Sequence, residues 1–181
     1  GAIVQDLSAS GAYLDIKGSD GVNGKVYGVS GTTIGLLDDQ NHYLIKGVKD
    51  GAVTLYYDNT AELETTSGGV KLSGYSESVI FAGGSINSNP TINFNEANHF
   101  SYTLTGNVTF LNPTTEHVGQ SGSIIITQDG TGSRTAAWQN NFKWTGGTAP
   151  TLSTAANAVD RIDYLVVAAD QIHCVASLDV K

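Results

Sequence analysis

The chain has 181 residues, and its 17 acidic and nine basic side chains give a formal net charge of −8 at neutral pH. Nucleic acids and anionic membrane surfaces both attract clustered Lys and Arg, and no two basic residues are adjacent in this chain, so neither is an expected partner. The single cysteine, Cys174, cannot close a disulfide within the chain, and no apolar run approaches the roughly 20 residues of a membrane span.

Composition divides the chain near residue 78. All five Phe, both Trp and all three Pro lie beyond this point, whereas six of the eight Tyr lie before it. Aromatic side chains supply the largest apolar area per residue, so the first part has little material for a core of its own. We therefore predict a β-rich shaft or repeat region over residues 1–78, completed by other chains. A C-terminal β-sandwich head with a jelly-roll-like fold is expected over residues 79–181.

The first 74 residues alternate between short runs of strand-forming residues and turn residues. Stretches such as Gly18–Gly21, Asp38–Asn41 and Ser67–Gly69 supply positive φ or local side-chain hydrogen bonds. This spacing predicts an all-β meander. The predicted strands are Ala2–Leu7, Ala12–Lys17, Lys25–Val29, Thr33–Leu37, His42–Val48, Ala52–Tyr57, Ala61–Thr65 and Val70–Leu72.

Each of these strands has one modestly apolar side. Leu14 and Ile16 share one side of their strand, and Val53 and Leu55 share one side of theirs. A single sheet would leave these sides in water, where isolated hairpins are marginally stable. Identical chains joined around a three-fold axis would bury them together. We therefore predict an intertwined homotrimer of triple-β shaft type, and an ordinary monomeric β-sandwich is the competing interpretation.

Beyond residue 90 the alternation of apolar and polar residues is sharper. Residues 91–95, 100–105 and 108–110 predict half-buried antiparallel strands. The run 122–128 is followed by Asp129-Gly130, a hairpin signal, so Arg134–Trp138 is the expected returning strand. Residues 152–158 are Ala-rich but predicted mainly as loop, because a strand at 162–168 follows almost at once. A last strand over 172–178 makes about eight in the head.

Two segments resemble a known protein family. Gly51–Gly74, GAVTLYYDNTAELETTSGGVKLSG, resembles the repeat units of bacteriophage tail fibres. Gly119–Asp163 resembles the C-terminal domain of phage tail-fibre and related virion appendage proteins, with a Trp, Gly-Gly, Ala-Pro-Thr-Leu and Ala-Asn-Ala-Val-Asp in this order. The resemblance implies a virion attachment component in a phage tail or another external appendage, and no catalytic motif comes with it. The chain contains no Met, so we expect it to be a fragment of a longer fibre.

Patterns for catalysis and metal binding are sparse. His173 directly precedes Cys174 in a predicted strand, so the two side chains point to opposite faces, and Cys174 is predicted to be a buried apolar residue. Glu62 and Glu64 would lie about 7 Å apart on one strand face, which glycoside hydrolysis permits, although alternating Glu usually marks a solvated face. Asp38–Asn41 offers oxygen ligands but lacks the alternation of a calcium loop. We predict no enzyme, no cofactor and no metal site.

Recognition is the chemistry that this composition favours. An aromatic and amide-rich stretch near residue 140 combines flat rings, which stack on sugars, with amides, which bind hydroxyls. Packing of these rings into the core is the alternative interpretation. The loops at 116–121 and 146–150 are further candidate contacts, because binding residues concentrate on loops held by a rigid scaffold. The candidate binding residues are Trp138, Asn140, Asn141, Lys143 and Trp144.

These observations favour a structural virion protein, a homotrimeric tail fibre or comparable appendage that mediates attachment to the host cell surface. Its expected partners are other virion tail proteins and a host surface glycan or envelope protein. Three weak sites on one trimer would gain affinity through avidity. One alternative is a purely structural connector or capsid-bound fibre without receptor binding. A polysaccharide depolymerase tailspike is a further alternative.

Overall fold

A computed structural model describes residues 12–19, 21–29 and 31–181. The chain divides into two compact units, Gly1–Ser76 and Glu77–Lys181. The described residues form fifteen strands and one short 3-10 turn, which confirms the all-β class predicted from the sequence. No helix within the described ranges is long and apolar enough to cross a membrane.

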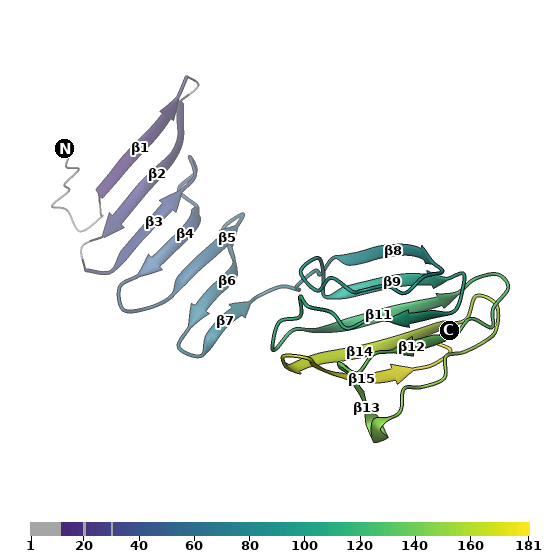
Figure 1. The fold of residues 1–181 in the computed structure, drawn as a ribbon. Coiled ribbons are helices and arrows are strands. Elements are labelled where there is room, and N and C mark those ends of the chain that lie inside the picture. Colours follow the sequence, from purple (N-terminus) through teal and green to yellow (C-terminus); the bar gives the residue numbers. More distant parts are fainter. Residues whose placement is uncertain (1–11, 20, 30) are drawn as a thin grey trace. The chain divides into compact units, whose positions relative to one another are not determined.

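The N-terminal unit contains a seven-stranded antiparallel sheet in which each strand pairs with its neighbours in sequence (Figure 1). This meander was predicted, and the strand ends agree to within one residue except that β2 begins at Gly21 and not at Lys25. The predicted strand Ala2–Leu7 lies outside the described residues. The strands are β1 (Ala12–Gly18), β2 (Gly21–Val29), β3 (Thr33–Leu37), β4 (Tyr43–Val48), β5 (Val53–Tyr57), β6 (Thr60–Thr66) and β7 (Gly69–Leu72).

One face of this sheet carries a continuous line of aliphatic side chains, here called the aliphatic row. The pairing registers place one such residue from every strand beside the next. Five of the seven members are between 38 and 51 % exposed, so a single chain leaves this face open to water. The members are Leu14, Val26, Leu36, Ile45, Leu55, Leu63 and Leu72.

The opposite face is covered by a line of aromatic rings, here called the tyrosine ladder. Successive ring centroids are 5.1, 6.1 and 5.8 Å apart. Gly35 on β3 makes the line continuous, because a Cβ there would lie 2.8 Å from Cε1 of Tyr43 and would push that ring away. Leu37 and Thr54 on this face are buried. The members are Tyr13, Tyr27, Tyr43 and Tyr56.

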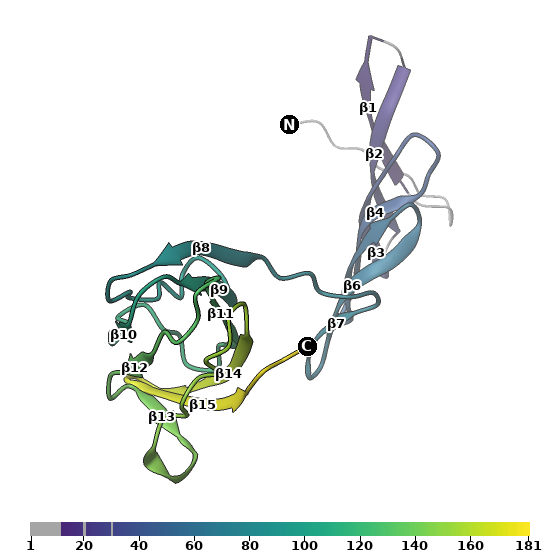
Figure 2. The ribbon, with the colours of Figure 1, turned by 90° about the vertical axis from the view of Figure 1, so that its right-hand side faces the viewer.

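The C-terminal unit has two sheets around one core. The larger sheet has six strands in the order β13-β15-β14-β11-β9-β8, and β10 and β12 form the smaller one. In Figure 2 the larger sheet curves into an arc, and β10 and β12 lie across its open side. Phe94, Phe100, Phe110 and Ile162 are among the fully buried side chains of this core. The strands are β8 (Ile80–Ile86), β9 (His99–Leu104), β10 (Val108–Phe110), β11 (Ser121–Gln128), β12 (Ala136–Trp138), β13 (Phe142–Trp144), β14 (Val159–Ala168) and β15 (Gln171–Ser177).

The predicted antiparallel pairing of this unit is wrong for several strands. β9 pairs in parallel with both β8 and β11, and β10 pairs in parallel with β12. The alternation itself was interpreted correctly, because Phe100, Tyr102 and Leu104 are all buried. Alternation indicates which side of a strand is covered but not the direction of its neighbour, so this pattern cannot distinguish parallel from antiparallel pairing. The strand order does not establish a jelly-roll-like topology, which stays a prediction.

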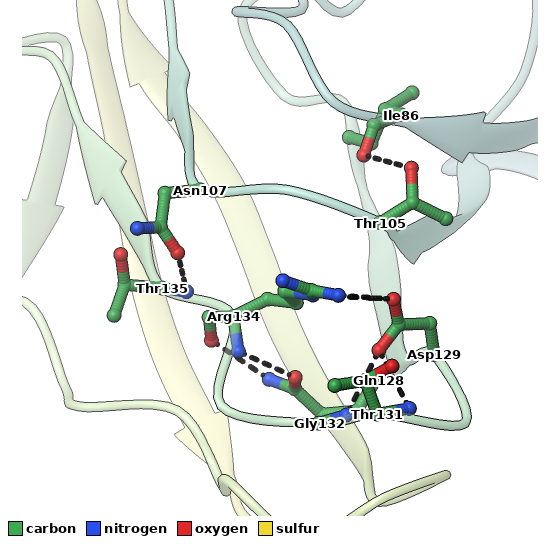
Figure 3. A network of polar contacts seen from close by, with 9 residues as sticks. All are labelled: Ile86, Thr105, Asn107, Gln128, Asp129, Thr131, Gly132, Arg134 and Thr135. Carbon is green, nitrogen blue, oxygen red and sulfur yellow. Dashed lines mark hydrogen bonds and ion pairs between the residues drawn. The ribbon is translucent and has the colours of Figure 1, made fainter.

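The predicted hairpin at Asp129-Gly130 is also wrong, because β12 pairs with β10 and not with β11. The chain leaves β11 through a loop held by side chains (Figure 3). The buried Gln128 accepts a hydrogen bond from the Arg134 N–H and donates to the Arg134 carbonyl, both at 2.8 Å. The Asp129 carboxylate accepts from the N–H groups of Thr131 and Gly132 and from the Arg134 guanidinium. These bonds fix a loop that carries β12 to the smaller sheet.

Two further segments show where the strand predictions succeed and fail. Ile92 and Phe94 are buried as the alternation predicts, yet residues 91–95 form a single bridge at Thr91 followed by a turn. Most of residues 152–158 is irregular, as predicted. The next strand, β14, begins at Val159 and pairs antiparallel with β15 as expected.

Candidate binding site

The structure brings most of the predicted binding residues together around one cavity of about 400 Å³. The cavity lies where the end of β12 meets β13, so it joins the smaller sheet to the edge of the larger one. Four of the five predicted residues line it, and Asn141 does not. The lining residues are Trp138, Gln139, Asn140, Phe142, Lys143, Trp144, Gly147 and Ala149.

Aromatic packing fixes the two tryptophans. The ring of Trp138 stacks on Phe110 with a centroid separation of 4.2 Å and an interplanar angle of 11°. Phe142 and Trp144 approach it edge to face, at 4.9 and 5.2 Å. Trp138 and Trp144 are both half-buried. The rings therefore belong to the edge of the core and also form the cavity wall, so both interpretations of this stretch hold in part.

A residue that the sequence did not single out, Asn112, holds the amide segment in place. Its backbone N–H donates to Oε1 of Gln139 at 2.7 Å, and its Nδ2 donates to Oδ1 of Asn140 at 2.7 Å. Its Oδ1 accepts the backbone N–H of Asn141 at 3.0 Å. Asn112 precedes Pro113, and an Asn-Pro pair in a sequence indicates a turn. It does not indicate hydrogen bonds to residues nearly thirty positions away.

Asn141 has a structural position. Its side chain is 5 % exposed and donates from Nδ2 to Oδ1 of Asp170 at 2.7 Å, while its carbonyl accepts the Ile172 N–H at 2.8 Å. These bonds join the segment to the turn between β14 and β15 and to β15 itself. Asn141 therefore does not line the cavity, but its hydrogen bonds hold the neighbouring lining residues in place.

The polar groups of the cavity suit binding. Lys143 is exposed, and its Nζ donates to the Asn140 carbonyl at 2.5 Å. The indole N–H groups of Trp138 and Trp144 are buried and have no hydrogen-bond partner within the described chain. The lining residues include two amides and one ammonium group but no carboxylate. A general acid or base of the Asp or Glu type is therefore missing among them, while donors for a hydroxyl- or carbonyl-bearing ligand are present.

The loop after β13 closes one side of the cavity. Thr145–Gly147 forms the short 3-10 turn η1, and Gly146 and Gly147 have φ of 71° and 78°. Of the two loops named as alternative contacts, 146–150 contributes Gly147 and Ala149 to the cavity. In the other loop, Gln120 donates from Nε2 to the carbonyls of Phe94 and Ala97, which anchors it to the core.

The other candidate residues are engaged in local structure. Glu64 faces Lys71 at 3.9 Å, and Glu62 is the extra residue of a bulge where β6 pairs with β5. Asp38 accepts the backbone N–H groups of Gln40 and His42 at 2.9 and 2.8 Å, so its carboxylate organises a polar turn.

The predicted burial of the one cysteine is confirmed. Cys174 is 2 % exposed, and burial raises the pKa of its thiol to about 12. Its neighbour His173 is exposed on the opposite side of β15, as the strand alternation requires.

The described residues of both units are all-β, with a partly exposed aliphatic sheet face in the first unit and an aromatic-lined cavity in the second. Residues 89–168 match the family model described as "Putative phage tail fibre C-terminal domain". Residues 89–168 are thus similar to a phage tail fibre C-terminal domain, which confirms the resemblance seen at Gly119–Asp163. The resemblance at Gly51–Gly74 lies outside the matched residues and stays a prediction. No match was found among curated proteins or among solved structures.

Proposed function

We propose that this protein is part of a homotrimeric phage tail fibre that attaches the virion to the host cell surface, and that it acts by binding and not by catalysis. The tail fibre domain in the C-terminal unit supports a structural tail protein. The aliphatic row in the N-terminal unit is the observation that carries the assembly. The cavity at Trp138 and Trp144 is the proposed receptor site.

The aliphatic row demands a partner surface. Leu14, Leu36 and Leu55 are 51, 39 and 40 % exposed, although they are aligned in one continuous line. Full burial of a Leu or Ile contributes about 1.5 to 3 kcal/mol, so burying the exposed half of each member contributes roughly 1 kcal/mol. Seven members per chain then supply on the order of 5 to 10 kcal/mol, which is comparable with the roughly 4 to 15 kcal/mol that association costs in lost freedom of motion.

Copies of the same chain are the partners that fit best. The row contributes one residue from each strand, so identical rows can meet level by level along a common axis. The opposite face is covered by its own tyrosine ladder, with Leu37 and Thr54 already buried. Contact with other chains would therefore bury much more apolar area on the aliphatic face than on the ladder face. A closed ring of three such contacts has no open end at which further copies could add.

Two adjacent residues of β4 test the assembly. Ile45 belongs to the aliphatic row, whereas Lys46 is on the ladder face, because Lys46 pairs with Gly35 and Ile45 with Leu36. We expect the unmodified chain of 18.9 kDa to have three times this mass in solution. Ile45→Asn should lower the trimer population, and Lys46→Asn, the matched control, should leave it unchanged. A monomeric unmodified chain, or equal effects of both substitutions, would refute the assignment.

Attachment is tested separately at the cavity. The purified trimer should bind host cells or their extracted surface glycan, and Trp144→Ala should weaken this binding while the solution mass stays that of the trimer. Absence of binding by the unmodified trimer would favour a connector without receptor binding. Release of reducing sugar from the host glycan would instead favour a depolymerase.

A further inference from the structure

The tyrosine ladder is a second ordered aromatic surface, distant in sequence from the cavity and not required by it. Cross-strand aromatic pairs stabilise a sheet, but that role does not account for the lysines found on the same face. Nζ of Lys25 lies over the Tyr13 ring at 5.5 Å from the centroid, and Nζ of Lys46 lies over the Tyr43 ring at 5.3 Å. Two cations thus accompany the line of rings.

These two lysines differ from the other lysines of the face. Lys17 forms an ion pair with Asp15 at 3.8 Å, and Lys71 forms one with Glu64 at 3.9 Å. Lys25 and Lys46 have no carboxylate partner within 4.0 Å among the described residues, and Lys25 donates a hydrogen bond to the neutral Asn41. Asp15 lies opposite Lys25 in the β1–β2 register but pairs with Lys17, so neither Lys25 nor Lys46 forms an ion pair within 4.0 Å among the described residues.

We propose that the tyrosine ladder with Lys25 and Lys46 binds an acidic polysaccharide, whose sugar rings lie on the tyrosines and whose carboxylates pair with the lysines. The inference rests on the proposed function, because trimerisation through the aliphatic row turns the ladder face outward. The C–H bonds of a sugar face are attracted to the negative face of an aromatic ring. A tyrosine ring is uncharged at neutral pH in any case, and burial, and then the neighbouring tyrosines, raise the pKa of Tyr43 further.

The chemistry favours a sparsely charged polymer over a nucleic acid. Duplex DNA carries a charge about every 1.7 Å and is repelled by a protein of net charge −8. Two isolated lysines among four rings suit a chain with many sugar faces and one carboxylate per repeat. Pairing of exposed charges is weak for each contact, so repetition along the polymer and on three chains would supply the affinity.

The test uses polygalacturonate, an unbranched polymer with one carboxylate per sugar, and its methyl ester, which keeps the rings but lacks the charge. The trimer of this chain should bind polygalacturonate, and this binding should weaken at high salt and with the ester. Lys25→Gln/Lys46→Gln should reduce affinity about tenfold, which corresponds to roughly 1.4 kcal/mol. Tyr13→Leu at the exposed end of the ladder should weaken binding of both polymers.

The double variant Lys17→Gln/Lys71→Gln is the matched control, because it removes the same charge from the same face but from lysines that already have acidic partners. Its affinity should fall by clearly less than that of Lys25→Gln/Lys46→Gln. No binding of polygalacturonate, or equal loss in the two double variants, would overturn the inference. The solution mass of the same samples shows whether the trimer forms, so a lack of polysaccharide binding can be distinguished from a lack of assembly. Cell binding through Trp144 is measured in a separate assay.

Discussion

Gly35 is the position at which the N-terminal sheet should be least tolerant of a single added methyl group. A Cβ at Gly35 would lie 2.7 Å from the Ile45 carbonyl oxygen and 2.8 Å from Cε1 of Tyr43. The backbone oxygen cannot move without disturbing the pairing of β3 with β4, and the ring cannot move without leaving the ladder. Overpacking of this kind costs about 2 kcal/mol. Gly35→Ala should therefore lower the thermal midpoint of the unit by about 10 °C.

Gly28→Ala supplies the comparison, because the nearest atom to a Cβ at Gly28 is the Thr33 carbonyl oxygen at 3.9 Å. Replacing Gly with Ala at a compatible strand position is neutral or stabilises by up to about 1 kcal/mol. Thermal unfolding followed by near-ultraviolet circular dichroism of the tyrosines measures both variants, at one protein concentration because assembly adds to stability. Equal midpoints for Gly35→Ala and Gly28→Ala would refute the proposed role of Gly35 beneath Tyr43.

Four further outcomes are expected in the C-terminal unit. Gln128→Leu should destabilise it by about 2 kcal/mol in urea unfolding, because the Arg134 N–H and carbonyl lose their partners. The hydrogen bond from Arg134 lowers the pKa of Asp129 in the folded unit. The ionised carboxylate therefore stabilises the folded unit at pH values above its unfolded pKa. This stabilisation is lost as the pH falls through the folded pKa of Asp129. Arg134→Gln should therefore flatten the loss of stability below about pH 4. Cys174, with a pKa near 12, should react with a thiol reagent at pH 8 only after denaturation. Trp144→Ala should weaken host-cell binding by tenfold or more without changing the oligomer mass.

The strands of the N-terminal unit could be predicted because the turn residues at their ends are visible in the sequence. Asp50, Asp58 and Asn59 have φ of 54°, 45° and 61°, a conformation that Asp and Asn tolerate better than other non-glycine residues. The apolar side of each strand was also visible in the alternation of Leu14 with Tyr13. The continuous row and ladder were not predicted, because they depend on pairing registers and on the bulges that shift them.

The C-terminal unit shows what local patterns leave undetermined. Asp129-Gly130 is a strong hairpin signal, but the side chains of Gln128 and Asp129 bind the following loop and redirect the chain. The parallel partners of β9 lie far from it in sequence or require a crossover, so alternation could not identify them. The aromatic and amide-rich composition near residue 140 was enough to indicate the candidate site. Its geometry depends on Asn112, whose contacts span nearly thirty residues.

The chemical difference between the two faces of the N-terminal sheet unites the assembly and binding proposals. Among the described residues of this unit, no second layer covers either face of the sheet, so each face depends on its own side chains for protection from water. Tyrosines cover one face within the chain, since rings about 5 to 6 Å apart shield Leu37 and Thr54 while keeping polar hydroxyl and lysine groups at the surface. Aliphatic side chains on the other face stay partly exposed, and in the proposed assembly they would be buried against other chains. The two proposals therefore use different faces of the sheet: the aliphatic row for assembly and the tyrosine ladder for a ligand.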